Sequence, residues 1–176
     1  MSTHPTPLHN AQSPRDFEPG TETGRAFRDA LGHFATGITV VTCNSDIGPL
    51  GITANSFASV SLDPPLVLWS PAKASKRFAA FSQATHFAIH VMSDTQRDVC
   101  GGFATNGGAF DALSWRPSET GVPLIDGCLT RFECTRHALH DAGDHAIIVG
   151  RVTRAQISGG NPLMFYCGKY GGFEET

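Results

Sequence analysis

Long apolar runs, surplus positive charge and paired cysteines are scarce or missing in this sequence. No stretch approaches the roughly 20 apolar residues that a membrane-spanning helix needs. Thirteen Lys and Arg stand against sixteen Asp and Glu, which gives a net charge of −3. This balance lacks the basic excess of proteins that bind nucleic acids or anionic membranes. We therefore expect neither nucleic acid nor a membrane among the partners.

The cysteines and the N-terminus bear on the cellular compartment. The five cysteines are odd in number and form no C-x-x-C pair, so neither a disulfide framework nor a zinc ribbon is indicated. The first twenty residues contain no apolar run that could serve as a secretion signal. Reduced thiols are typical of the cytosol. We therefore expect a cytoplasmic protein.

Motifs of common nucleotide-binding and hydrolytic sites are absent as well. No G-x-G-x-x-G, G-x-x-x-x-G-K-[ST] or G-x-S-x-G occurs. Eight histidines raise the question of a metal site. His86 and His90 fall in an expected strand, where four residues span about 13 Å, too far for two imidazoles to share one ion. No metal site is expected.

Length and composition favour a single domain rich in turns. The chain has 176 residues, of which 40% are hydrophobic and 16% charged, enough to build a core. Nineteen glycines and eleven prolines indicate many turns and β structure. Residues 1–22 contain four prolines and few large apolar side chains. We expect them to form a flexible N-terminal tail before a domain over residues 23–176.

Hydrophobic periodicity predicts mostly strands after one helix. The helical period covers residues 27–34, with Thr23 as N-cap and Gly37 as stop. Residues 93–96 have the form of a capping box that opens a later helix. Hairpin-type links dominate, so we expect a closed antiparallel β-barrel with two or three peripheral helices. The expected strands are 38–43, 50–62, 66–69, 86–92, 129–139, 145–157 and 164–166, and the other expected helices are 75–82 and 93–103.

Small polar residues at strand ends form the first two candidate sets. Thr53, Ala54, Asn55 and Ser56 interrupt an apolar strand and offer donors and acceptors for a heteroaromatic edge or a polyol. A β-bulge or solvated strand end explains them slightly better from composition alone. The second set precedes a predicted short helix and is suited to a phosphate, although a solvated helix start fits equally well. It consists of Ser70, Lys73, Ser75 and Lys76, followed by Arg77.

Two further candidate sets lie in turns and next to glycines. His145 directly follows the turn at residues 141–144, so a ligand could meet it there, although such residues usually mean only a hairpin turn. Phe103 and Tyr170 have glycine neighbours and could lie against a planar ring, but most aromatic residues of small domains belong to the core. No single set decides a function.

Read together, the sets resemble the flavin reductase-like, FMN-binding split-barrel family from about Ala26 to Phe173. Its specific marks here are TANSFASVSLDPPL and GDH with the nearby Gly150. The other matching stretches are FRDALGHFATGITVVT, SKRFAAF, CGGFATNGGAFDALSW, GVPLIDGCLTRFEC and PLMFYCGKYGGF.

The resemblance implies a fold and a site. The fold would be a mainly β, six-stranded antiparallel Greek-key split β-barrel, present as a homodimer. His145 would bind the nicotinamide beside the flavin. Of the other residues, Thr53, Ala54, Asn55 and Ser56 would line the isoalloxazine and ribityl chain, Ser70, Lys73, Ser75 and Lys76 would hold the phosphate, and Phe103 and Tyr170 would lie at the cofactor rim.

The resemblance also implies an activity. The protein would be an NAD(P)H:flavin oxidoreductase that transfers a hydride from NADH or NADPH to FMN, with FAD as the other candidate flavin. It would supply the reduced flavin to a partner monooxygenase. Two alternatives stay open: an FMN-binding electron carrier or sensor without nicotinamide turnover, and a non-enzymatic subunit that only supports a partner.

Overall fold

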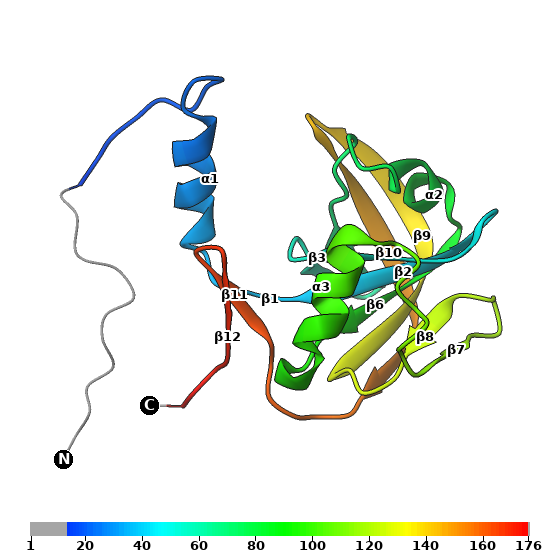
Figure 1. Cartoon of the computed structure of the whole chain (residues 1–176). Helices are drawn as coiled ribbons and strands as arrows, with labels where there is room; N and C mark the ends of the chain where they lie inside the picture. The colour runs from blue at the N-terminus through cyan, green and yellow to red at the C-terminus, as the bar shows by residue number, and fades with distance from the viewer. Residues whose placement is uncertain (1–13, 176) are drawn as a thin grey trace, which may run out of the picture.

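The fold is rich in strands, with the helices at its periphery (Figure 1). The computed structural model describes residues 14–175. The helices are α1 (Gly24–Gly32), α2 (Phe78–Gln83), the 3-10 helix η1 (Asp94–Gln96) and α3 (Arg97–Thr105). The strands are β1 (Thr36–Gly37), β2 (Thr39–Ser45), β3 (Gly48–Ala54), β4 (Ala58–Leu62), β5 (Pro65–Trp69), β6 (His86–Val91), β7 (Trp115–Pro117), β8 (Pro123–Ile125), β9 (Thr130–Ala142), β10 (His145–Ile157), β11 (Met164–Tyr166) and β12 (Lys169–Gly171).

Seven antiparallel strands form the main sheet, in the order β3-β2-β6-β9-β10-β5-β4. Its two edge strands, β3 and β4, are joined by residues 55–57 alone. A flat sheet of seven strands would hold its edges about 29 Å apart. The step from Ala54 to Ala58 spans at most about 14 Å. The sheet therefore curls strongly, and its edges approach one another where β3 leads into β4.

The predicted six-stranded barrel is wrong in strand number. The single strand expected over residues 50–62 is two strands, because the chain leaves the sheet after Ala54 and re-enters at its other edge, where β4 pairs with β5. Among residues 14–175 no backbone pairing joins β3 to β4. The mainly β character and the peripheral helices are confirmed. A three-stranded sheet, β1-β11-β12, and the β7-β8 pair lie outside the main sheet.

The helix boundaries agree with the sequence in one place and differ in another. The capping box of Ser93 and Gln96 is present and leads through η1 into α3. Helix α1 ends at Gly32, not at Gly37, because the chain turns at His33 and enters β1 at Thr36. Thr23 stands at the N-cap position, but its hydroxyl donates to the Glu18 carbonyl at 2.8 Å and caps no helix N–H.

Two buried clusters lie on opposite faces of β2, since successive side chains of a strand alternate. Val41 belongs to the first cluster, where Trp69 meets Phe81 edge-on with ring centroids 5.1 Å apart. Val40 belongs to the second, which lies beneath α3 and contains Phe103. A Cβ atom on Gly51 of β3 would lie only 2.5 Å from the Phe103 ring. Glycine at position 51 thus allows α3 to pack closely on the sheet.

Helix α1 stands apart from the main sheet, beside β1, β11 and β12 (Figure 1). None of its residues is buried. Phe27 and Leu31 on the helix and Phe34 just after it are 43%, 59% and 78% exposed. The apolar face that predicts this helix is therefore left largely uncovered by the other residues of 14–175.

Much of the predicted N-terminal tail, residues 1–13, lies outside the described residues. Residues 14–23 carry no helix or strand. Within the described part of the chain, no helix combines the length and the apolar character needed to cross a bilayer.

His90 links three strands from the interior of the protein. It is fully buried on β6; its Nδ1 lies 3.0 Å from the Val40 carbonyl, and its Nε2 accepts the Ile125 N–H at 3.0 Å. Because Nε2 accepts a hydrogen bond, the proton of the neutral ring is on Nδ1. Burial lowers the pKa of His90 from 6.5 to about 4.

This buried ring predicts a loss of stability in acid. Between pH 6.5 and about 4 the unfolded chain takes up a proton at His90 that the folded chain does not, so falling pH favours unfolding. The stability that depends on the neutral ring is complete above about pH 6.5 and falls by up to about 3 kcal/mol towards pH 4. Urea unfolding across this range should show a shallower pH dependence for His90→Gln than for wild type. The exposed His140→Gln variant is the control, and equal slopes for wild type and His90→Gln would contradict the prediction.

Candidate functional site

Two serines join the ends of β3 and β5. The hydroxyl of Ser56, just after β3, accepts the Ser70 N–H at 2.9 Å and donates to the Ser70 carbonyl at 3.2 Å. Ser70 directly follows β5, and both residues are half-buried. The two sets predicted at residues 53–56 and 70–76 are therefore neighbours in space.

Lys73 connects the second set to the turn between β9 and β10. Its backbone N–H donates to the Asp144 carbonyl at 2.9 Å. Its Nζ donates to Asp141 Oδ2 at 2.7 Å and to the Gly143 carbonyl at 2.6 Å. The hydrogen bond and the positive charge of Lys73 lower the pKa of the Asp141 carboxyl. This contact fixes the turn that carries His145 against the segment after β5, and neither Asp141 nor its contact with Lys73 is evident from the sequence.

His145 opens β10 with its side chain 43% exposed. Its Nδ1 lies 2.8 Å from Asp144 Oδ1. This hydrogen bond is the main cause that lowers the pKa of the Asp144 carboxyl. An ionised carboxylate only accepts hydrogen bonds, so Nδ1 carries a hydrogen and Nε2 of the neutral ring keeps a lone pair. The geometry therefore makes Nε2 an acceptor for a donor group of a ligand.

The residues before Ser56 have different surroundings. Thr53 on β3 donates from its hydroxyl to the Cys100 carbonyl at 2.6 Å, which ties the strand to α3. Ala54 uses its carbonyl to accept the Thr39 hydroxyl at 2.7 Å. Asn55 is exposed at the end of the strand. Of these residues, Asn55 has the polar side chain that faces solvent.

The residues before α2 divide between structural and accessible groups. Ser75 Oγ accepts the Arg77 N–H at 3.3 Å. The Arg77 guanidinium donates to the carbonyls of Gly51, Phe103 and Ala104, so this cation fastens α3 to β3. Lys76 is exposed between them. Lys76 is therefore the most accessible cation of the predicted phosphate set.

The side chains of the two aromatic candidates pack in the cluster beneath α3. Phe103 is fully buried and meets Phe110 edge-on, with ring centroids 4.8 Å apart. The ring lies wholly within the core, which does not support its predicted place at a cofactor rim. Tyr170 is half-buried on β12, with the Arg97 guanidinium 5.3 Å from its ring centroid. It packs at the edge of the cluster beneath α3.

Comparison with known proteins identifies the family. The flavin reductase like domain family matches residues 31–174. The chain belongs to this family.

Relatives of this flavin reductase cover most of its length. The FMN reductase (NADH) SmoA of Agrobacterium fabrum is 60% identical over 157 residues, which are 89% of this chain and 90% of SmoA. HsaB of Mycobacterium tuberculosis, the reductase subunit of a flavin-dependent monooxygenase, is 41% identical and covers 85% of this chain and 82% of HsaB. The solved structure of the NADH:FAD oxidoreductase SgcE6 of Streptomyces globisporus superposes with a TM-score of 0.85 at 34% identity, over 94% of this chain and 96% of that one. The predicted family and enzyme class are confirmed.

The polar groups of this flavin reductase suit a flavin mononucleotide. Asn55 offers a planar amide with both donors and an acceptor, as the edge of a flavin ring requires. The Ser56–Ser70 contact brings the residue after Asn55 next to the start of the segment that carries the two lysines. A neutral ring at one end and a phosphate at the other match such a set. Lys73 is partly neutralised by Asp141, so Lys76 supplies the more available charge.

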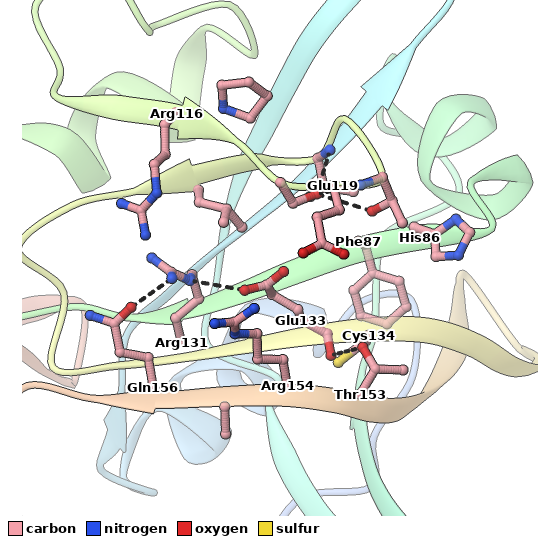
Figure 2. A pocket seen from close by; sticks show the side chains of 16 residues that line it. His86, Phe87, Arg116, Glu119, Arg131, Glu133, Cys134, Thr153, Arg154 and Gln156 are labelled. Carbon is pink, nitrogen blue, oxygen red and sulfur yellow. Dashed lines mark hydrogen bonds and ion pairs between the residues drawn. The ribbon is translucent and has the colours of Figure 1, made fainter.

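A separate cavity of about 590 Å³ contains none of the predicted site residues. It lies between the β7–β8 hairpin and strands β6, β9 and β10, and its wall includes Arg131, Glu133 and Arg154 (Figure 2). Among the described residues, no group of three His, Cys, Asp or Glu side chains is placed to hold a metal ion.

Proposed function

We propose that this flavin reductase transfers a hydride from NADH to FMN and supplies the reduced flavin to a partner oxygenase. The observation that carries the proposal is the convergence of the segments after β3, after β5 and before β10, which carry Asn55, the two lysines and His145. SmoA is by name an NADH-dependent FMN reductase, and HsaB is by name a monooxygenase subunit. We choose FMN over FAD as the flavin because SmoA is more similar to this chain than SgcE6, which is by name an NADH:FAD oxidoreductase.

The residues at the ends of β3 and β5 would hold the two ends of the flavin. Bound FMN supplies the chemistry of a two-electron acceptor. Asn55 and Ser56 would bind the ring edge and the ribityl hydroxyls, and Thr53 and Ala54 would support them from β3. Lys76 would bind the phosphate together with Ser70, Lys73 and Ser75.

His145 would orient the nicotinamide. Its Nδ1 is held by Asp144, which leaves Nε2 as an acceptor for the carboxamide N–H of the dinucleotide. Its partial exposure at the start of β10 allows a ligand to reach it. Its role is positional, because the hydride passes between the two small molecules and needs no acid–base pair of the protein.

The proposal is tested by NADH oxidation with the purified full-length chain. Activity should depend on added flavin, be fastest with FMN among FMN, FAD and riboflavin, and prefer NADH to NADPH. Flavin binding without any NADH oxidation would instead favour an electron carrier or sensor. Failure to bind any flavin would contradict both functions.

The role of His145 predicts a selective kinetic defect. His145→Ala removes one hydrogen bond to the nicotinamide, so the apparent KM for NADH should rise about five- to tenfold. The Kd for FMN, measured by fluorescence quenching, should change little. His140→Ala, an exposed histidine of the same hairpin, is the matched control. An equal loss of NADH and FMN binding, or no loss, would contradict this role.

The phosphate assignment predicts discrimination between two flavins. Lys76→Ala removes a charge that only FMN can use, so FMN should bind about tenfold more weakly while riboflavin binding stays the same. Lys73→Ala should also weaken FMN, and should raise the KM for NADH because Lys73 holds the turn before His145. Lys169→Ala on the exposed part of β12 is the control. Equal losses for FMN and riboflavin would refute the phosphate role.

A homodimer and a cytoplasmic location belong to the same proposal. The exposed apolar side chains of Phe27, Leu31 and Phe34 support a second copy as the partner of α1. Sedimentation velocity tests this, since a monomer at micromolar concentration would contradict it.

The five free cysteines support a reducing compartment, and localisation of a tagged protein in the periplasm would contradict it.

A further inference from the structure

The cavity beneath the β7–β8 hairpin differs in character from the flavin site. Its floor is formed by strands β6, β9 and β10, and its roof by the hairpin and its turn. Figure 2 shows Arg116 and Glu119 extending from the hairpin towards Arg131, Glu133 and Arg154 on the sheet. Its volume of about 590 Å³ is within the range of small-molecule sites.

The Arg131 guanidinium is buried there with few acceptors. The residue is 4% exposed, and its Nη2 donates to Gln156 Oε1 at 2.6 Å. Its Nε is buried without a hydrogen-bond partner, and the nearest carboxylate atom, Glu133 Oε1, is 3.7 Å away. That separation gives Coulomb attraction but no hydrogen bond. A buried cation with an unused donor is costly, so an acceptor that enters the cavity beside this guanidinium would be favoured.

The other groups of the cavity indicate the charge and shape of that acceptor. Arg116, Arg154 and His86 add basic groups to Arg131, against the carboxylates of Glu119 and Glu133. Arg116 is already paired with Asp126 at 2.8 Å, which leaves Arg131 and Arg154 as the main cations. Val122 and Leu124 give the cavity an apolar wall. A planar carboxylate matches the fork of a guanidinium, and an apolar body matches the wall.

We propose that this cavity is a second ligand site, distinct from the flavin site, that binds a small organic carboxylate through Arg131. The Arg131 guanidinium would bind the carboxylate of the ligand, because its Nε has no hydrogen-bond acceptor within the protein. Arg154 strengthens the attraction from the neighbouring strand, and the hairpin covers the apolar part of the ligand. The site does not depend on the proposed flavin chemistry.

Benzoate is a suitable probe, with benzamide as its uncharged counterpart. Isothermal titration of the full-length protein should show benzoate binding, with and without saturating FMN, and benzamide binding at least about tenfold more weakly. Arg131→Gln should weaken benzoate about tenfold or more, whereas Arg151→Gln, an exposed arginine of β10 outside the cavity wall, should leave it unchanged. FMN-dependent NADH oxidation should survive in both variants.

Each contrary outcome has a distinct meaning. No benzoate binding up to about 10 mM overturns the proposal, including the case in which a second copy of the chain covers the cavity. Competition by FMN, or equal binding of benzamide, also overturns it. Arg154→Gln, at an exposed residue, decides the matter if Arg131→Gln fails to fold: unchanged benzoate affinity would overturn the proposal. Absence of flavin reduction in the wild type would refute the proposed function and leave this test intact.

Discussion

The contact between Lys73 and the β9–β10 turn is the constraint on which the arrangement of the site depends. Lys73 binds this turn through its ammonium group and its backbone, and Ser70 in the same segment is bonded to Ser56 after β3. Three strand ends from distant parts of the chain are thereby held together. The ammonium group is partly exposed, so its Coulomb attraction is screened and its value is mainly geometric. A site for two stacked ligands needs this fixed geometry more than it needs large local stability.

The sequence predicts the local elements better than their partners. β-branched runs and the capping box of Ser93 and Gln96 are local signals, and the strands and helix that they predict are present. The prediction of a single strand over residues 50–62 is wrong because the sequence gives no sign of the break at Asn55, where neither glycine nor proline occurs. Only the curl of the sheet shows why the chain crosses from one edge to the other there.

The same distinction holds for the candidate sites. A small polar set within an apolar strand, and two of three lysines in one loop, are visible as local anomalies, and the Ser56–Ser70 contact joins the two segments that carry them. Phe103 is a local signal that misleads. Glycines near an aromatic residue can make room for a ligand, but here Gly51 makes room for the Phe103 ring itself in the core. Asp141 lies 68 residues from Lys73 and Arg131 lies 25 from Gln156, so neither contact has a local sequence signal. The Arg131–Gln156 contact depends on the register of β9 against β10, and the Lys73–Asp141 contact on how the segment after β5 packs on their turn.

Four of the five cysteines are buried and behave as core residues. Burial raises the pKa of Cys43, Cys100 and Cys134 to about 12 and also raises that of Cys128, so these thiols stay protonated at neutral pH. Only the thiolate is an effective nucleophile, and these four therefore act as small apolar core residues. In the proposed function, the protein would contribute rigid strand ends that fix where the two ligands meet. The close fit of Phe103 on Gly51, the Lys73 contact and the Asp144–His145 pair each serve that rigidity at a different point of the fold.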